Sequence, residues 1–207
     1  MSESRSGLPK HKASDFDRDF FDRFYGDPKT RVADAGHAER LVDLIAGVVG
    51  YLELPVRRIL DAGCGVGLLR ERLLARFPKA RYEGLELSAY LCERFGWHQG
   101  SIADFHATKP YDLVICHDVL QYLDDKTAAK AIRQLAKLAG GALYLSVLTE
   151  RDWRVSADQV RTDEDVRRRS VDWYQRRLRR GFRHVAAGVH VVRSLSPILW
   201  ELEQPWI

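Results

Sequence analysis

Three glycines follow an aspartate at alternate positions in the stretch Asp61–Gly67. The aspartate ends an apolar run that contains Ile59 and Leu60, and a helical pattern begins at Leu68. Glycine permits a sharp turn and lets a ligand touch bare backbone, and the first turn of a helix offers unpaired N–H groups. A β-branched run before such a turn is typical of a buried parallel strand. The stretch therefore predicts a strand–turn–helix unit that binds a nucleotide.

The spacing of these glycines distinguishes between classes of nucleotide. The dinucleotide fingerprint is G-x-G-x-x-G, and its third glycine would fall at Leu68. The pattern over residues 61–67 is instead D-x-G-x-G-x-G, which resembles motif I of the class I S-adenosylmethionine-dependent methyltransferases. A glycine-rich turn that binds no ligand is the alternative for these seven residues alone, so partner motifs must support the resemblance.

Three further matches to this family follow in order within residues 57–148. The next predicted strand ends at Glu86, about twenty residues on, where a carboxylate can accept both ribose hydroxyls. Gly100-Ser101-Ile102 stands at the expected adenine contact, although Ser101 replaces the usual acid and Asp104 is an alternative. The segment that begins with His117 and Asp118 stands beside the expected methionine moiety and methyl group.

The resemblance implies S-adenosylmethionine as cofactor and S-adenosylhomocysteine as product. Replacing Glu86 by alanine should then weaken cofactor binding while barely changing the stability of the ligand-free protein. The residues that the resemblance assigns to the cofactor are Asp61, Gly63, Cys64, Gly65, Gly67, Glu86, Leu87, Ser101, Ile102, His117 and Asp118.

Methyl transfer from a sulfonium is an in-line displacement in which the protein mainly aligns nucleophile, carbon and sulfur. A general base helps only where the acceptor carries a proton that must leave. His117 and Tyr122 are the candidate catalytic residues, with Asp118 as an orienter, because histidine titrates near neutrality. The alternative is that His117 turns away and contributes only its backbone.

The motifs of several methyltransferase classes, each specific for one kind of acceptor, are absent from this sequence. There is no Asn-Pro-Pro-Tyr or Asp-Pro-Pro-Tyr, no cysteine precedes proline, and no acidic metal motif stands at Ser146–Thr149. We therefore expect no catalytic metal and a small or medium-sized polar acceptor, methylated at O or N and less readily at C. Two alternatives stay open: an RNA methyltransferase that uses an arginine-rich helix over residues 163–180, or a non-catalytic nucleoside-binding partner protein.

Charge is concentrated in one segment of the chain. The net charge is +4, and residues 151–183 hold eleven arginines and six acids. The acids cluster at the start of the predicted helix 163–180 and the arginines at its end, as the helix dipole favours. Pairs such as Glu164/Arg168 and Asp165/Arg169 have helical i, i+4 spacing. This favours a solvated helix face over a nucleic-acid surface.

Predicted strands alternate with predicted helices, which indicates βαβ crossovers and a parallel sheet. Only Gly188 separates the last two β-like runs, so they must pair as an antiparallel hairpin. We expect an α/β fold: a doubly wound, mostly parallel seven-stranded sheet with a C-terminal antiparallel hairpin and helices on both faces. The predicted helices are 16–24, 37–52, 68–77, one capped by Ser88, 124–139 ended by Gly140, and 163–180; the strands are 57–61, 81–87, 97–99, 111–117, 142–148, 182–187 and 189–193.

The chain divides into a disordered tail (1–14) and a single class I methyltransferase domain (15–207). The motif core accounts for the cofactor but not for binding of the acceptor. We expect an N-terminal helical cap (15–54) and a substrate loop or lid (149–162) to bind the acceptor. Tyr25, Trp153 and Arg154 are the candidate substrate-binding residues, and their chemistry suits a polar or anionic small molecule, although Trp153 is as consistent with packing. Three cysteines without C-x-x-C, no signal peptide and no membrane span favour a cytoplasmic protein. The sequence leaves a monomer and a homodimer both open.

Overall fold

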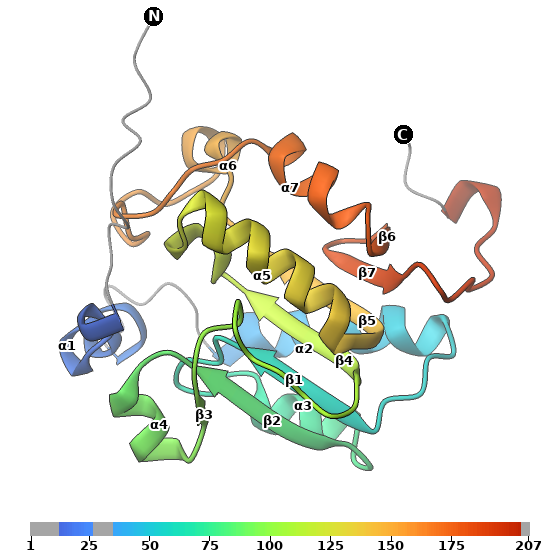
Figure 1. Cartoon of the computed structure of the whole chain (residues 1–207), viewed down its shortest axis with the longest axis horizontal. Coiled ribbons are helices and arrows are strands. Elements are labelled where there is room, and N and C mark those ends of the chain that lie inside the picture. The colour runs from blue at the N-terminus through green and yellow to red at the C-terminus, as the bar shows by residue number, and fades with distance from the viewer. Residues whose placement is uncertain (1–12, 27–34, 204–207) are drawn as a thin grey trace, which may run out of the picture.

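The computed structural model describes residues 13–26 and 35–203. Within these residues seven strands form one sheet in the order β3-β2-β1-β4-β5-β7-β6 (Figure 1). The strands are β1 (Arg58–Ala62), β2 (Arg81–Glu86), β3 (His98–Gln99), β4 (Tyr111–His117), β5 (Ala139–Ser146), β6 (Phe182–Ala186) and β7 (Val189–Val192). The helices are α1 (Arg18–Phe21), α2 (Ala35–Tyr51), α3 (Arg70–Arg76), α4 (Ala89–Phe95), α5 (Asp125–Leu138), α6 (Glu150–Val155) and α7 (Val171–Leu178).

The pairing of the strands confirms the predicted doubly wound sheet. β1 lies parallel to both β2 and β4, and β5 lies parallel to β4. β7 pairs antiparallel with β5 and with β6, so the C-terminal hairpin is also confirmed. From β1 the chain adds β2 and then β3 on one side of the sheet, and it then returns to add β4 and β5 on the other side. The strand order therefore reverses between β1 and β4. This is the point at which doubly wound sheets bind ligands.

Two apolar layers hold the helices to the sheet. One contains Leu60, Val114 and Leu143 together with Ile132 and Leu135 of α5. The other lies on the opposite face and joins Ile59 and Leu113 to the apolar side of α2 and to Leu73 of α3. Figure 1 shows α5 and α7 on one side of the sheet and α2 and α3 on the other. No helix in the described parts of the chain is long and apolar enough to cross a bilayer.

Two sequence-based boundaries are wrong. Gly140 does not end a helix, because α5 ends at Leu138 and the chain passes directly into β5, where Gly140 and Gly141 lie. Gly141 is required there, since a Cβ would lie 2.4 Å from the carbonyl oxygen of Asp112 on β4. A Cβ at Gly140 itself would lie 3.0 Å from the Cβ of Pro110, so the close packing beside β4, and not a helix end, accounts for both glycines.

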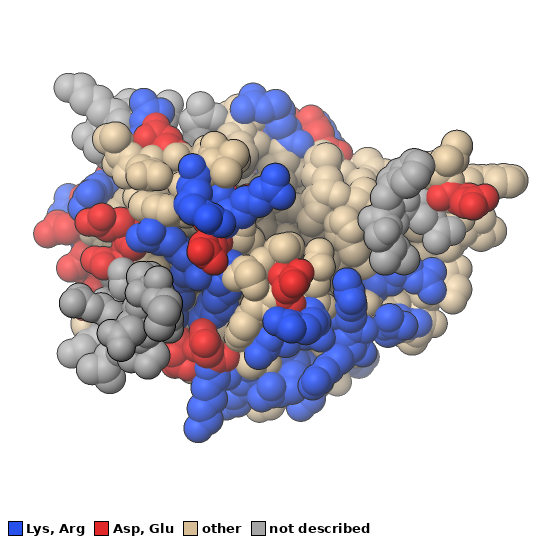
Figure 2. Space-filling model, turned by 90° about the horizontal axis from the view of Figure 1, so that it is seen from above, with Lys and Arg blue, Asp and Glu red and all other residues tan. Residues whose placement is uncertain are grey.

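The predicted helix 163–180 is also wrong in its first half. Ser170 caps α7 by accepting a hydrogen bond from the backbone of Trp173, so the helix covers only Val171–Leu178. The Arg169 guanidinium binds Asp125 of α5. Basic side chains still gather on the face that carries α6 and α7 (Figure 2). Glu164 and Asp165 are not helical, so the predicted helical i, i+4 geometry is wrong there; Arg168 instead donates to the carbonyl oxygen of Glu164.

Candidate functional site

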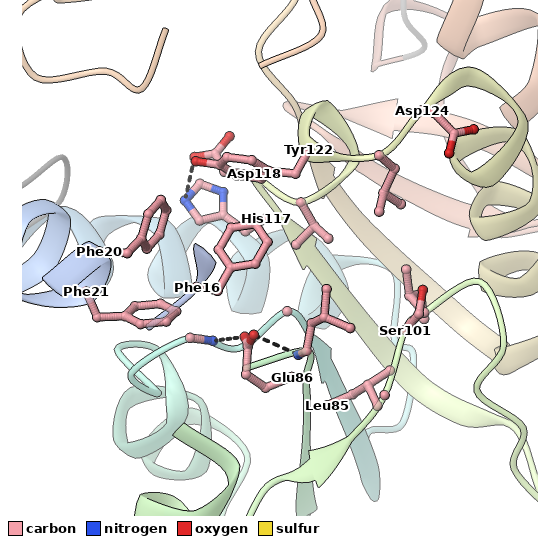
Figure 3. A pocket seen from close by; sticks show the side chains of 17 residues that line it. Phe16, Phe20, Phe21, Leu85, Glu86, Ser101, His117, Asp118, Tyr122 and Asp124 are labelled. Atoms are coloured by element: carbon pink, nitrogen blue, oxygen red, sulfur yellow. Dashed lines mark hydrogen bonds and ion pairs between the residues drawn. The ribbon is translucent and has the colours of Figure 1, made fainter. Parts of the chain in front are cut away.

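A pocket opens at the carboxyl ends of β1, β2 and β4, next to the point where the strand order reverses (Figure 3). Glu86, Leu85 and Ser101 lie along one side of it, and Phe20, His117 and Asp118 lie along the other. Its full lining is Phe16, Phe20, Phe21, Gly63, Gly65, Leu85, Glu86, Leu87, Gly100, Ser101, Ile102, His117, Asp118, Val119, Tyr122, Leu123 and Asp124.

The glycine turn after β1 forms one wall of the pocket. The backbone N–H groups of Gly63 and Cys64 both donate to the carbonyl oxygen of Leu85, which fastens the turn to β2. Gly65 has a φ of +53°, and a Cβ there would point to open space with Phe21 3.8 Å away. Gly63 has no such room, because its Cβ would lie 2.3 Å from Val119. The turn is therefore tight at Gly63 and open to the pocket at Gly65.

Trp97 fixes the turn from behind. Its indole Nε1 donates to the carbonyl oxygen of Gly65 at 3.0 Å. Its ring occupies the space that side chains at Gly67 and Gly84 would need, because Cβ atoms there would lie 2.8 Å and 2.6 Å from it. Gly67 and Gly84 thus make room for a tryptophan. Cys64 is buried beside them and does not line the pocket.

Gly84→Ala is expected to lower the free energy of unfolding by about 1–3 kcal/mol, because its methyl group overlaps Trp97 and the Cys64 sulfur in a packed core. Gly50→Ala is the matched control. It lies in α2 with no atom within 4 Å of the new Cβ, so it should stabilise the helix slightly. Urea unfolding of both variants gives the comparison, and equal stability of the two would contradict the steric role of Trp97.

Glu86 ends β2 and is held by the backbone around it. Its Oε1 accepts from the N–H groups of Leu87 and Ser88 at 2.7 and 2.9 Å, and its Oε2 accepts from that of Gly65 at 2.9 Å. A carboxylate has about four acceptor positions, so capacity remains for roughly one more donor. Because the side chain lines the pocket, that donor can come from a ligand.

Asp61 lies behind the turn and does not line the pocket. It is buried, and it accepts a hydrogen bond from the Tyr82 hydroxyl at 2.8 Å. Burial raises the pKa of its carboxyl to about 6, against a lowering by the Tyr82 bond. The aspartate of the D-x-G-x-G-x-G pattern therefore supports the turn through Tyr82 in this structure.

The pKa of Asp61 predicts a pH-dependent effect of Asp61→Asn. Because the native pKa of about 6 exceeds the ordinary 3.8, the native state binds more protons between these values. Wild-type stability therefore falls as the pH rises through 6, whereas asparagine stays neutral. At pH 7 the variant should be more stable by about 3 kcal/mol, since one pKa unit corresponds to 1.36 kcal/mol.

Denaturant unfolding between pH 4 and 7.5 measures this difference, which should disappear near pH 4. Asp104→Asn is the control, because Asp104 is exposed and pairs with Lys130 at the surface. A difference for Asp61→Asn that does not change with pH would show that its carboxyl is not perturbed.

His117 and Asp118 stand at the end of β4. The His117 Nε2 lies 3.5 Å from an Asp118 carboxylate oxygen, and its Nδ1 is buried with no hydrogen-bond partner among the described residues. The ring also packs against His37 of α2 and Tyr144 of β5, at centroid distances of 6.3 and 6.0 Å. Both predicted residues line the pocket, and Figure 3 shows the His117 ring beside Asp118.

The N-terminal residues form an aromatic wall of the pocket. Phe16 and Phe20 pack edge-to-face at 5.1 Å, and Tyr122 packs on Phe16 at 5.4 Å. The Ser88 hydroxyl donates to the carbonyl oxygen of Phe16 at 2.6 Å and so fastens this segment beside Glu86. The sequence pattern identifies these rings as one face of a helix, but it does not show that this face meets the glycine turn.

Arg169 is a buried residue that the sequence pattern misassigns. Its guanidinium donates to the carbonyl oxygens of Leu120 and Leu123, to the Tyr174 hydroxyl and to Asp125. These bonds tie the short turn after β4, which carries Tyr122, to α5 and α7. Nothing in the spacing around Arg169 distinguishes it from its exposed neighbours, so its role depends on the tertiary fold.

The structure brings together nine of the residues singled out from the sequence. These are Gly63, Gly65, Glu86, Leu87, Ser101, Ile102, His117, Asp118 and Tyr122. Asp61, Cys64 and Gly67, which were also assigned to the cofactor, do not line the pocket. Gly100 of the expected adenine contact and Phe20 of the N-terminal cap also line it. Lining residues that were not identified as site residues are Phe16, Phe21, Leu85, Val119, Leu123 and Asp124.

The candidate substrate residues do not join this pocket. The predicted loop 149–162 contains α6, which begins with a capping box between Thr149 and Asp152. Trp153 is half-buried with the Arg168 guanidinium stacked 3.9 Å from its ring centre, and Arg154 is exposed. Neither lines the pocket. The side chain of Tyr25 lies outside what the structure describes, as does the predicted tail up to residue 12.

Comparison with known proteins decides the family. The family described as "Methyltransferase domain" matches residues 23–195. The chain belongs to this methyltransferase family. The resemblance in the glycine turn and the strands that follow it is thereby confirmed.

Similar proteins show how far this assignment extends. The chain is 31% identical over 140 residues to malonyl-[acyl-carrier protein] O-methyltransferase of Hahella chejuensis, and this match covers 58% of the chain and 50% of that protein. It is 31% identical over 104 residues to trans-aconitate 2-methyltransferase of Pseudomonas aeruginosa, covering 46% and 37%. The chain thus spans half or less of these relatives.

A solved structure shares most of the fold. Magnesium protoporphyrin IX methyltransferase from Synechocystis PCC 6803, solved with bound SAH, superposes with a TM-score of 0.60 at 21% identity. The match covers 87% of this chain and 95% of that one. At this identity the likeness shows the fold alone.

Proposed function

We propose that this chain is an S-adenosylmethionine-dependent methyltransferase that acts on a small molecule at O or N. The observation that supports this best is the pocket itself. In it, Gly65, whose missing side chain leaves space for a ligand, lies beside Glu86, whose carboxylate can accept a further hydrogen bond. Both lie at the point where the strand order reverses. The family membership of residues 23–195 points to the same activity.

The residues present fit this cofactor. A Cβ at Gly65 would enter the space that a ligand needs, and Glu86 can accept from a ribose hydroxyl. Leu85 and Ile102 supply apolar contacts, and Ser101 supplies a hydroxyl at the same end of the pocket. When bound, S-adenosylmethionine supplies an activated methyl group on a sulfonium sulfur.

The protein's own part is to hold the nucleoside and to order the acceptor. Glu86 and the turn at Gly65 bind and orient the nucleoside of the cofactor. The rings of Phe16, Phe20 and Tyr122 cover the pocket and exclude water. We propose that the N-terminal segment acts as the cap, since it carries two of these three rings. We further propose that His117, beside Asp118, accepts a proton from the acceptor.

The test is calorimetric titration with S-adenosylmethionine, S-adenosylhomocysteine and NADH. We expect both adenosyl compounds to bind and NADH not to bind. Methyl transfer from labelled S-adenosylmethionine to a metabolite extract, with the products separated by mass, then distinguishes an enzyme from a nucleoside-binding partner protein. Binding of NADH with no response to either adenosyl compound would overturn the proposal.

A further inference from the structure

The lining of the pocket is acidic. Three of its residues are carboxylates, namely Glu86, Asp118 and Asp124, and none of the described residues that line it is a lysine or an arginine. Hydrogen bonds from Thr127 lower the pKa of Asp124, which keeps that group charged at neutral pH. Trp153 and Arg154, which would have suited an anionic acceptor, lie elsewhere. The described wall therefore offers no cation to bind an anionic acceptor.

Two of these carboxylates already have strong protein partners. Glu86 accepts three backbone N–H groups. Asp124 caps α5 and accepts from both the backbone and the hydroxyl of Thr127. Asp118 differs from them, because its side chain is 46% exposed and its carboxylate contacts the His117 Nε2 at 3.5 Å rather than backbone N–H groups. It is therefore the carboxylate most available to a ligand.

The backbone of Asp118 is held in an uncommon conformation. Its φ is +55°, in the left-handed region that non-glycine residues seldom adopt. Its N–H donates to the carbonyl oxygen of Ser146 on the neighbouring β5 at 3.0 Å, which holds the residue in place. Such conformations cluster at ligand sites, where the surrounding structure stabilises them.

Aromatic rings lie on the same side of the pocket as Asp118 (Figure 3). Phe16, Phe20 and Tyr122 pack with interplanar angles of 77–89° and centroid distances of 5.1–6.3 Å. The faces of such rings carry partial negative charge and attract cations. A carboxylate beside aromatic rings is the combination that binds an ammonium group.

We propose that the methyl acceptor is an amine, whose ammonium form binds between Asp118 and the rings of Phe20 and Tyr122. This proposal rests on the methyltransferase function proposed above and names its substrate class. A carboxylate acceptor is disfavoured, because it would meet three like charges and no cation in the described wall.

The amine must lose a proton before it can attack. His117 accepts that proton, and Asp118 at 3.5 Å stabilises the imidazolium that results. The nitrogen lone pair then forms the new C–N bond to the methyl carbon. The C–S bond breaks with its electron pair remaining on sulfur, so the sulfonium becomes a neutral thioether and the methylated amine carries the positive charge. The proton on His117 passes to solvent.

The test uses three probes that share a phenyl ring and a two-carbon arm: phenethylamine, phenethyl alcohol and 3-phenylpropionate. Each is titrated by NMR into the protein saturated with S-adenosylhomocysteine. We expect the amine to bind most tightly and the carboxylate to bind most weakly. Asp118→Asn should reduce amine affinity about tenfold and leave alcohol affinity unchanged, because only a charged partner is lost. Asp43→Asn, which removes an exposed partner of Arg76 and does not line the pocket, should change neither affinity.

The outcomes separate this proposal from the function on which it rests. If S-adenosylhomocysteine does not bind the wild-type protein, the methyltransferase proposal fails and the amine proposal fails with it. If S-adenosylhomocysteine binds, then no amine binding, equal or tighter carboxylate binding, or an amine affinity unchanged by Asp118→Asn overturns the amine proposal alone. Cofactor affinity of Asp118→Asn is measured in the same series, so that an indirect effect through the cofactor is recognised.

Discussion

Gly65→Val is expected to abolish binding of S-adenosylmethionine, with a loss of affinity of at least about a hundredfold. A Cβ at this position would point into the pocket, with Phe21 3.8 Å away, and valine adds two further methyl groups in the same direction. The φ of +53° also disfavours a β-branched side chain, so the turn itself would be strained. Isothermal titration calorimetry on the purified variant measures the loss.

Gly96→Val separates the two causes. Gly96 ends α4 with a φ of +73° and has no atom within 4 Å of a new Cβ, so valine there shares the backbone strain without entering the pocket. Both variants should have a lowered melting temperature, but only Gly65→Val should lose the cofactor. If Gly96→Val loses affinity to the same extent, strain rather than occlusion of the pocket explains the result.

The sequence was sufficient for the sheet because its signals are local. The apolar runs of β1 and β4, the glycine turn between β1 and α3, and the cap Ser88 depend on residues within a few positions of each other. The hairpin followed from Gly188 alone, since no helix fits between β6 and β7. The predicted order of the strands is accordingly right, whereas the helix α6 lies in a segment predicted as a loop.

Contacts between distant segments could not be predicted in this way. The carbonyl of Gly65 is bound by Trp97, thirty-two residues away, and the same indole explains Gly67 and Gly84. Arg169 reaches the carbonyl of Leu120 across forty-nine residues. Neither pairing leaves a periodic or motif-like signal in one sequence. The glycine motif was therefore recognised correctly. Gly67, however, was assigned to the cofactor, and in the structure it makes room for the Trp97 side chain.

Glu86→Gln is expected to weaken cofactor binding roughly tenfold, because a hydrogen bond to a charged group is worth about 1.5–3 kcal/mol. The structure also changes the expectation for stability. The carboxylate accepts three backbone N–H groups in the ligand-free protein, and an amide has one oxygen with which to accept them. The melting temperature of the variant should therefore fall as well. This differs from the expectation from the sequence, in which Glu86 only binds the ribose and its loss barely changes stability.

Glu83→Gln distinguishes a site effect from a general one. Glu83 lies in the same strand, binds Arg58 and Tyr111, and does not line the pocket. Its substitution should lower stability without changing the affinity for S-adenosylhomocysteine, whereas Glu86→Gln should lower both. If Glu86→Gln keeps full affinity while losing stability, the carboxylate serves only to shape the turn at Gly65, and the ribose must be held by another group of the pocket.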